Sequence, residues 1–407
     1  MRLRGGCHHE VSLDAATPRK PTASSQGTVF SPHEDSETVR SREACVAGAS
    51  RGSRIELTGP TPPGMSCLHL IGLNLVAILG IETLIYGVED LVLSQRFFED
   101  FGLVLESSVG GVAVFRLPDG SSVVLRSLDD PALAPSSIEG PGVREIIWGV
   151  DDELSLGALV ENLASDHIVR RDDAGGAYFL PSFGVPMGLR VFRNRPVLSA
   201  PEPSNSPGRT VRLNQHRRWR QRAFPKVIAH VVFAMPDFLA GAAFMCDRLG
   251  FRLTDEQVGF GMYLRADGNN AHHNFLLLNA GAPLPDMDGK LRFHHANYAV
   301  ENLDEIMTGA NHMARRGWEP SHFGLGRHRV DSALFYYLPS PAGGEAEYGA
   351  DSDCVDEAWV PRRWPAPLFA YAHWVHDLPP FLRQPPEWRI EYLTDNFEVL
   401  PSHGSAH

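Results

Sequence analysis

The stretch IAHVVFAMPDFLAGAAFMCDRLGF, residues 228–251, joins a short apolar run to an amphipathic segment. An earlier stretch, IETLIYGVEDLVLSQRFFEDFGL at residues 81–103, follows the same pattern, and its Asp90 matches Asp237. Each stretch is predicted to form a β-strand followed by an α-helix. The similarity is an internal repeat, and a repeat organises a whole chain rather than one local segment.

The later parts of the two halves also match. YFLPSFGVPMGLRVF at residues 178–192 parallels YYLPSPAGGEAEYG at residues 336–349, with a shared LPS. The repeats predict an α+β fold of four βαβββ modules in two domains, the C-terminal pair forming an open, β-barrel-like cup. In the last module, NLDEIMTGANHMARRG is predicted to be a helix with Leu303, Ile306, Met307 and Ala310 on one face, ended by Gly317.

Composition sets the expected boundaries around these modules. The first segment is rich in Ser, Thr, Gly and Pro, which is typical of a disordered extension, and the functional protein is predicted to begin near Met65. A second Pro- and Ser-rich stretch, APEPSNSPGR, indicates a linker. The predicted organisation is an extension at 1–64, an N-terminal domain without metal at 65–195, a linker at 196–225, a catalytic domain at 226–365 and a tail over the domain surface at 366–407.

Charge and cysteine content limit the classes of function. The 407 residues carry a net charge of −12, which gives no electrostatic reason to expect nucleic-acid binding. The one basic cluster, Arg217, Arg218, Arg220 and Arg222, is interpreted as part of a solvated connector. The five cysteines are widely spaced without CxxC pairs, so a reducing cytoplasm is predicted. The apolar stretch from Cys67 to Gly80 is shorter than the ~20 residues of a membrane span, and no membrane association is expected.

Three residues of the second half form a possible metal-ligand set. His230, His295 and Glu347 each lie in a short apolar run that is predicted to be a strand. Two imidazoles and one carboxylate are the ligands of mononuclear iron(II) sites that leave positions open for substrate and oxygen. Each residue alone is more often structural, but the repeat would bring all three into one cup.

The two halves can be compared directly at these positions. The corresponding residues of the first half are Thr83 for His230, Glu145 for His295 and Leu189 for Glu347. The N-terminal copy therefore keeps the scaffold without the ligand set. One metal ion per chain is predicted, in a metal-binding cup of the C-terminal half.

The segment from Lys226 to Asp351 resembles the type I extradiol ring-cleaving dioxygenases of the vicinal oxygen chelate (glyoxalase/bleomycin resistance/dioxygenase) superfamily. The resemblance is carried by AHVVF, HHNFLLL, FHHANYAVENLDE, GRHRVDSALFYYLPSPAGGEAEYGAD and the WVPRRW that follows. It implies that His230, His295 and Glu347 are iron ligands.

The same resemblance implies roles for four further residues. His273 matches the active-site acid/base, and His328 and Tyr337 match residues that hydrogen-bond substrate or dioxygen. Asp331 matches an acidic position found in some members. Phe323 stands where members acting on carboxylated catechols carry an arginine, which favours an uncharged or apolar ring substituent.

The predicted function is an iron(II)-dependent extradiol dioxygenase that cleaves a catechol-type ring with incorporation of O2, in aromatic hydrocarbon catabolism. Manganese(II) is the alternative metal, and similar proteins imply a homo-oligomer. Two other interpretations stay open: a metal-dependent lyase or isomerase of the same superfamily, and a non-catalytic protein that binds an aromatic compound. The identity of the catechol and the position of cleavage do not follow from the sequence.

Overall fold

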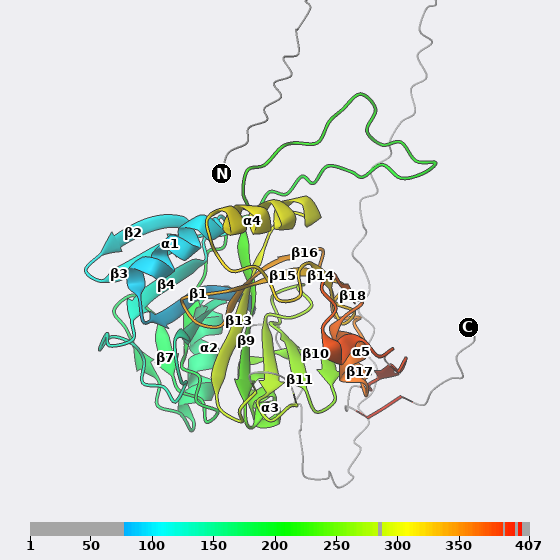
Figure 1. The fold of residues 1–407 in the computed structure, drawn as a ribbon. Helices are drawn as coiled ribbons and strands as arrows, with labels where there is room; N and C mark the ends of the chain where they lie inside the picture. The colour runs from blue at the N-terminus through cyan, green and yellow to red at the C-terminus, as the bar shows by residue number, and fades with distance from the viewer. Residues whose placement is uncertain (1–76, 284–286, 386, 395–397, 401–407) are drawn as a thin grey trace, which may run out of the picture. The chain divides into compact units, whose positions relative to one another are not determined.

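The computed structural model describes residues 77–283, 287–385, 387–394 and 398–400, and the strands within them form two mixed sheets (Figure 1). The predicted extension at 1–64 and the predicted start at Met65 lie outside these residues. In the described part of the chain, every helix is too short or too polar to cross a lipid bilayer.

The first sheet belongs to the N-terminal half and has the strand order β2-β3-β4-β1-β5-β8-β7-β6. Its strands are β1 Ile78–Val88, β2 Val104–Val109, β3 Val112–Arg116, β4 Ser122–Ser127, β5 Gly142–Val150, β6 Arg170–Arg171, β7 Ala177–Phe179 and β8 Met187–Val191. Its helices are α1 Leu91–Phe101 and α2 Glu153–Ala164.

The second sheet belongs to the C-terminal half and has the order β18-β14-β15-β16-β13-β9-β12-β11-β10-β17-β19. Its strands are β9 Val227–Met235, β10 Arg252–Gln257, β11 Gly261–Arg265, β12 Phe275–Asn279, β13 Arg292–Ala299, β14 Gly326–Arg327, β15 Leu334–Pro339, β16 Glu345–Ala350, β17 Arg362–Trp364, β18 Trp374–Val375 and β19 Glu391–Tyr392. Its helices are α3 Phe238–Leu249, α4 Leu303–Arg315, α5 Pro367–Tyr371 and the 3-10 helix η1 Pro380–Leu382.

The strand pairing repeats four times. In each module the first strand lies parallel to the last, as in β1 with β4, β5 with β8, β9 with β12 and β13 with β16. The first strands of paired modules are antiparallel, β1 with β5 and β9 with β13. Each strand order runs from one edge to another among the described residues, as expected of an open cup. The predicted α+β fold of four βαβββ modules is confirmed.

Each module helix begins at an acidic or amide side chain that caps it. Asp90, Asp152, Asp237 and Asn302 accept hydrogen bonds from the backbone N–H three residues further on, at 2.9, 2.8, 3.2 and 3.0 Å. Such a cap satisfies one of the free N–H groups of the first turn and contributes about 1 kcal/mol. The matched Asp90 and Asp237 of the sequence repeat are therefore the start signals of α1 and α3.

The buried face of α4 is shifted from the predicted one. Ile306 and Ala310 are buried as expected, but Leu303 is 41% exposed and Met313 is buried in its place. Leu303 is the first residue of the helix, and the turns that pack on the sheet come after it. Gly317 has a φ of 88° just beyond the C-cap, which agrees with the predicted end of this helix.

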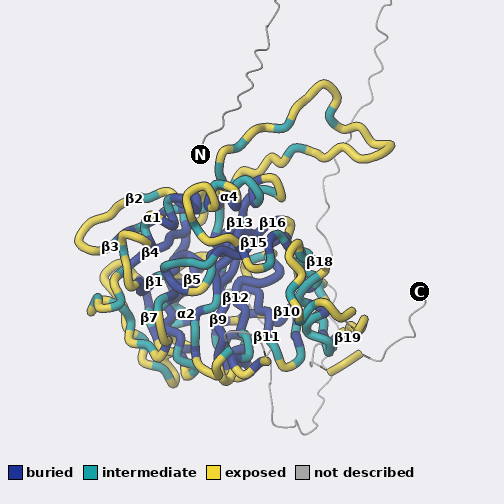
Figure 2. Tube along the Cα trace, viewed as in Figure 1, coloured by how far each residue is buried: buried dark blue, intermediate teal, exposed yellow. Residues whose placement is uncertain are grey.

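The cores of the two halves are continuous. Tyr86 of β1 and Tyr298 of β13 join their hydroxyls at 3.0 Å, and Phe101 of α1 stacks on Tyr348 of β16 at 4.0 Å between ring centroids. Figure 2 shows the central strands of both sheets as the buried part of the molecule. The N-terminal half therefore supports the strands β13 and β16 from behind.

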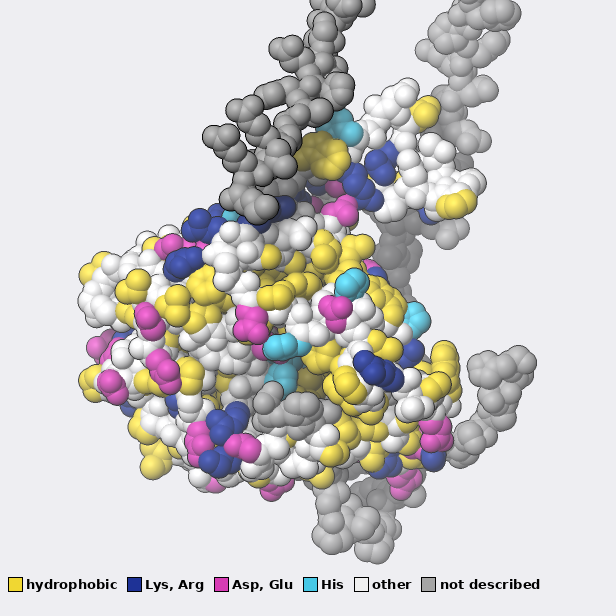
Figure 3. All heavy atoms as spheres, in the orientation of Figure 1, with side chains coloured by type: hydrophobic (Ala, Val, Ile, Leu, Met, Phe, Trp, Pro, Cys, Tyr) yellow, Lys and Arg dark blue, Asp and Glu magenta, His cyan; other side chains and the backbone are white. Residues whose placement is uncertain are grey.

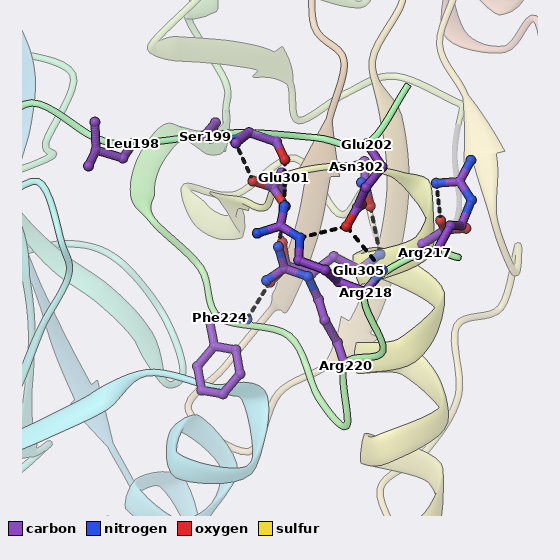
Figure 4. A network of polar contacts seen from close by, with 12 residues as sticks. Leu198, Ser199, Glu202, Arg217, Arg218, Arg220, Phe224, Glu301, Asn302 and Glu305 are labelled. Atoms are coloured by element: carbon purple, nitrogen blue, oxygen red, sulfur yellow. Dashed lines mark hydrogen bonds and ion pairs between the residues drawn. The ribbon is translucent and has the colours of Figure 1, made fainter. Parts of the chain in front are cut away.

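An ion-pair network holds the residues before β9 to the start of α4 (Figure 4). The buried carboxylate of Glu305 accepts hydrogen bonds from Arg220 at 3.1 Å and from the backbone N–H of Phe224 at 3.0 Å. Arg220 also pairs with Glu301. The other pairs of the basic cluster are Arg217 with Asp304, Arg218 with Glu202 and Arg222 with the Glu99 carbonyl. The basic cluster is therefore not only solvated as predicted, because Arg217 and Arg220 pair with acidic residues at and just before the first turn of α4.

The end of the chain joins the second sheet at both sides. Strand β17 lies parallel to β10, and β18 lies antiparallel to β14 (Figure 1). Between them, α5 buries Phe369 and Ala370. The described part of this segment is thus built into the sheet and does not only lie over the surface. Elsewhere, Lys and Arg side chains are interspersed with Asp and Glu on the face shown in Figure 3.

Candidate active site

The three predicted metal ligands come from adjacent strands of the second sheet, β9, β13 and β16. His230 on β9 and Glu347 on β16 both pair with Asn297 of the central strand β13. His295 lies two residues before Asn297 and therefore points to the same face of the sheet. The two Nε2 atoms are 3.3 Å apart, and Glu347 Oε2 lies 3.3 Å from that of His230 and 3.4 Å from that of His295. The fold therefore brings all three side chains to one point.

The arrangement fits a divalent cation. Glu347 is 1% exposed, and its Oε2 accepts no hydrogen bond although both imidazole nitrogens are close. Burial, and then the neighbouring His294, hold the pKa of His295 well below its usual value, so His295 is neutral and does not balance the carboxylate. A buried carboxylate without a partner is costly. A metal ion held by the two imidazoles and this carboxylate would remove that cost.

A second group of possible ligands lies beside the first and differs from it in its hydrogen bonds. His272, His273 and Asp331 have their ligand atoms within 4.8 Å of one another. However, His272 Nε2 pairs with Asp255 at 2.6 Å, and its Nδ1 pairs with His273 Nδ1 at 3.1 Å. Asp331 accepts hydrogen bonds from a backbone N–H at 3.2 Å and from Ser352 Oγ at 3.1 Å. Protein groups already satisfy this cluster, so the first triad is the candidate metal site.

His273 lies directly against the candidate metal site. Its ring stacks on that of His230 with 4.2 Å between centroids, and its Nδ1 is 4.0 Å from Asp331 Oδ2. Burial, and then the nearby His230, hold the pKa of His273 well below its usual range. The imidazole is therefore neutral and offers one lone pair and one N–H.

His328 and Tyr337 form a hydrogen-bonded pair on the other side of the triad. His328 Nδ1–H donates to the backbone carbonyl of Tyr371 at 2.5 Å, which leaves Nε2 to accept from the Tyr337 hydroxyl at 3.1 Å. The Tyr337 ring lies 5.1 Å from that of His295, between centroids. Burial, and then the charge of Glu347, raise the pKa of Tyr337 well above its usual value. Tyr336, the adjacent residue, belongs to the hydrophobic core.

Aromatic side chains surround the Tyr337 side of the site. Phe323 contacts the rings of Tyr337, Tyr371 and Phe381, with centroid distances of 6.4, 6.1 and 6.3 Å. Two of these rings, Tyr371 and Phe381, come from the C-terminal segment. Phe323, which stands where some members of the family carry an arginine, is thus part of an apolar wall.

Sequence reasoning missed the residues behind His272. Asp255 on β10 is fully buried and contacts Arg362 and Trp364 of β17 as well as His272. The WVPRRW motif contained the two partners, but no pattern in RLTDEQ marked Asp255. An Asp in a strand reads as a solvated residue unless its long-range partners are known.

The strand register refines the comparison of the two halves. Thr83 pairs with Ile147 in the first half, and His230 pairs with Asn297 in the second. Thr83 therefore corresponds to His230, and Glu145, two residues before Ile147, corresponds to His295 as predicted. Glu347 corresponds to Gly188, one residue before the predicted Leu189, because Ile147 pairs with Gly188. Both groups of possible metal ligands found among the described residues lie in the C-terminal half.

Paired βαβββ modules thus bring two histidines and a glutamate to one point, a ligand set that could hold a single metal ion. The sequence profile of the glyoxalase/bleomycin resistance protein/dioxygenase superfamily matches residues 227–343. These residues therefore match the superfamily that the resemblance implied, and proteins similar to the chain are named as extradiol dioxygenases.

Three similar proteins illustrate the relationship. Metapyrocatechase 2 of Cupriavidus necator is 26% identical over 75% of this chain and 91% of its own length. The iron-dependent extradiol dioxygenase of Rhodococcus jostii is 32% identical over 37% of this chain and half, 50%, of its own length. The Mn(II)-bound glyoxalase of Novosphingobium aromaticivorans shares the fold with a TM-score of 0.58 at 22% identity, over 76% of this chain and 96% of that one.

Proposed function

We propose that His230, His295 and Glu347 hold one iron(II) ion, with manganese(II) as the alternative. The chain is an extradiol dioxygenase that opens a catechol-type ring beside its two hydroxyls with incorporation of O2. The observation that supports the ligand assignment is the buried Glu347 oxygen that no protein group satisfies, between two imidazole nitrogens. When bound, the ion would supply a Lewis acid with open positions and a redox-active centre for catechol and dioxygen.

His273 is proposed as the acid/base of the reaction. It is neutral, buried and in contact with His230, so its lone pair lies close to where a catechol hydroxyl would bind. It takes a proton from that hydroxyl and later returns it to an oxygen of the opened ring. A neutral imidazole suits both steps because its lone pair can accept a proton and the resulting N–H can return it.

Tyr337 and His328 are proposed to position the reacting groups. The raised pKa of Tyr337 keeps its phenol protonated, so Tyr337 does not act as the base. Its hydroxyl donates a hydrogen bond to His328 Nε2. His328 is fixed by the Tyr371 carbonyl and keeps Tyr337 oriented. Asp331 lies 4.0 Å from His273 Nδ1, and its negative charge favours the protonated form of the His273 imidazole.

The aromatic wall of Phe323, Tyr371 and Phe381 indicates the class of ring substituent. A wall of aromatic rings favours an uncharged hydrophobic or aromatic substituent, and these three side chains offer no cation to a carboxylate. The proposed substrates are therefore catechols with uncharged substituents. The predicted homo-oligomer and cytoplasmic location stay predictions.

Oxygen uptake tests this function. The full chain is loaded with iron(II) without oxygen and mixed with mono- and bicyclic catechols, some of them carboxylated. One O2 consumed per catechol, with a yellow ring-opened product, is the expected result. Tight iron binding without oxygen uptake for any catechol would favour a lyase or isomerase of the same superfamily, and catechol binding without metal would favour a non-catalytic binding protein.

A further inference from the structure

A buried polar network lies directly behind His273. The side chains of Asp255 and His272 are both 0% exposed. Asp255 Oδ2 is 2.6 Å from His272 Nε2, and the carboxylate also accepts from Arg362 at 2.8 and 3.0 Å and from Trp364 Nε1 at 2.7 Å. A carboxylate with this many donors is ionised and can only accept. The Nε2 of His272 therefore carries a proton and donates it to Asp255.

The charges of the network leave His272 neutral. The two-point contact of Arg362 already balances the charge of Asp255, so this carboxylate needs no second cation. With its one proton on Nε2, His272 has a lone pair on Nδ1. The atom 3.1 Å away is His273 Nδ1, which must then donate. His273 thus carries its own proton on Nδ1 and its lone pair on Nε2.

We infer that Asp255 and His272 are positioning residues that hold His273 in the tautomer with the proton on Nδ1. The tautomer follows from the network itself, whereas its use in catalysis rests on the proposed function. In that use, the O–H bond of the substrate breaks and an N–H bond forms at His273 Nε2. The positive charge that His273 gains is stabilised through its Nδ1–H by the lone pair of His272, which Asp255 polarises in turn.

Packing alone does not explain the network. His272 is surrounded by the rings of Tyr263 and Trp359, at 5.8 and 5.9 Å between centroids, and an apolar ring would fill this space without two hydrogen bonds. Buried polar networks are costly unless every member is satisfied. The network is satisfied, and one end of it meets the proposed acid/base.

The first test measures the tautomer directly. The full-length, metal-free protein is labelled with 15N-histidine and studied by long-range 1H–15N correlation, with His273 assigned by its absence in His273→Gln. A proton on Nδ1 of His273 is expected in the native chain. In His272→Phe both tautomers are expected, whereas His272→Gln keeps one because its amide can accept from His273 and donate to Asp255. A proton on Nε2 of native His273, or an unchanged tautomer in His272→Phe, would overturn the inference.

The second test separates positioning from structure. For His272→Phe, kcat is expected to fall about 100-fold with little change in KM and in iron content, and His272→Gln should restore most of it. Trp359→Phe, which alters packing beside His272 and leaves its hydrogen bonds intact, is the matched control and should behave like the native chain. Equal loss of kcat in the Phe and Gln variants would contradict the inference.

A third variant, Asp255→Asn, is expected to reverse the tautomer of His273, a result that misfolding would not produce. In Asp255→Asn the new amide can donate to His272 Nε2, so the network should reverse and place the proton of His273 on Nε2. An unchanged proton on Nδ1 in this variant would overturn the inference. If no protein, native or variant, cleaves any catechol, the proposed function fails while the tautomer measurement still decides the network.

Discussion

The two halves of the chain share one scaffold and differ in what it carries. The eight module strands of each half have the same order and the same parallel and antiparallel pairs, and the module helices are capped in the same way. Where the C-terminal half places His230, His295 and Glu347, the N-terminal half has Thr83, Glu145 and Gly188. The scaffold therefore forms without the metal site, and the chemistry belongs to a few side chains on one copy.

The largest expected effect separates the halves by metal binding. Glu347→Gln should lower the affinity for iron(II) more than about 100-fold, because even residues that only support a ligand cost up to that much. Glu145→Gln, at the position equivalent to His295, should leave one iron per chain. Metal analysis after dialysis measures both. Native iron content in the Glu347 variant would contradict the ligand assignment.

The next effect tests catalysis without metal loss. His273→Gln should keep its iron and lose about 10²- to 10⁴-fold in kcat, the usual contribution of a general acid/base. Its counterpart in the first half is Ser121, since Phe275 and Val123 occupy equivalent positions in β12 and β4. Ser121→Ala should retain native kcat. Oxygen uptake under saturating catechol compares the two variants, and equal rates would remove His273 from the mechanism.

The third effect concerns the helix starts. Glu305 is fully buried and binds Arg220 and two backbone N–H groups, so Glu305→Gln should cost about 2 kcal/mol of stability and several degrees in the thermal midpoint. Ser155 holds the equivalent position in α2, and Ser155→Ala should cost less because it removes no charge. Thermal unfolding followed by circular dichroism checks the order of the two midpoints, and the reverse order would mean that the ion pairs contribute little.

The smallest effect concerns the substrate wall. Phe323→Arg should shift the ratio of kcat/KM toward carboxylated catechols about 10-fold, the value of one partly exposed charge pair. Ile168 is exposed in the loop between α2 and β6 of the first half and serves as the control site, and Ile168→Arg should leave the ratio unchanged. Competition between a carboxylated and an uncharged catechol gives the ratio. No shift in the Phe323 variant would place the ring substituent elsewhere.

Local signals in the sequence predicted the fold well. The apolar runs and the matched Asp90 and Asp237 indicated the strand-to-helix units, because these signals act within a few residues. The repeat then set the number of modules. The face of α4 was misplaced near Leu303, since which turns of a helix meet the sheet depends on tertiary packing.

Long-range contacts were the part that the sequence did not reveal. Asp255 meets Arg362 and Trp364 across 107 and 109 residues, and no local pattern records such a pairing. The residue that corresponds to Glu347 is Gly188 and not the predicted Leu189. Strand register depends on bulges, which the sequence repeat does not record, and the β1–β5 and β9–β13 pairs are both irregular. The site roles came from the resemblance, while the partners of Arg220 came only from the three-dimensional structure.

The placement of β17 and β18 has a consequence for biosynthesis. These two short strands cover the outer sides of β10 and β14, so one late segment protects both edges of the eight-strand core of the second sheet. Open edges pair readily with other chains. Because this segment follows the eight core strands in the chain, a nascent or shortened chain that lacks it exposes both edges at once. Chains that end before Arg362 should therefore aggregate during expression rather than accumulate as inactive folded protein.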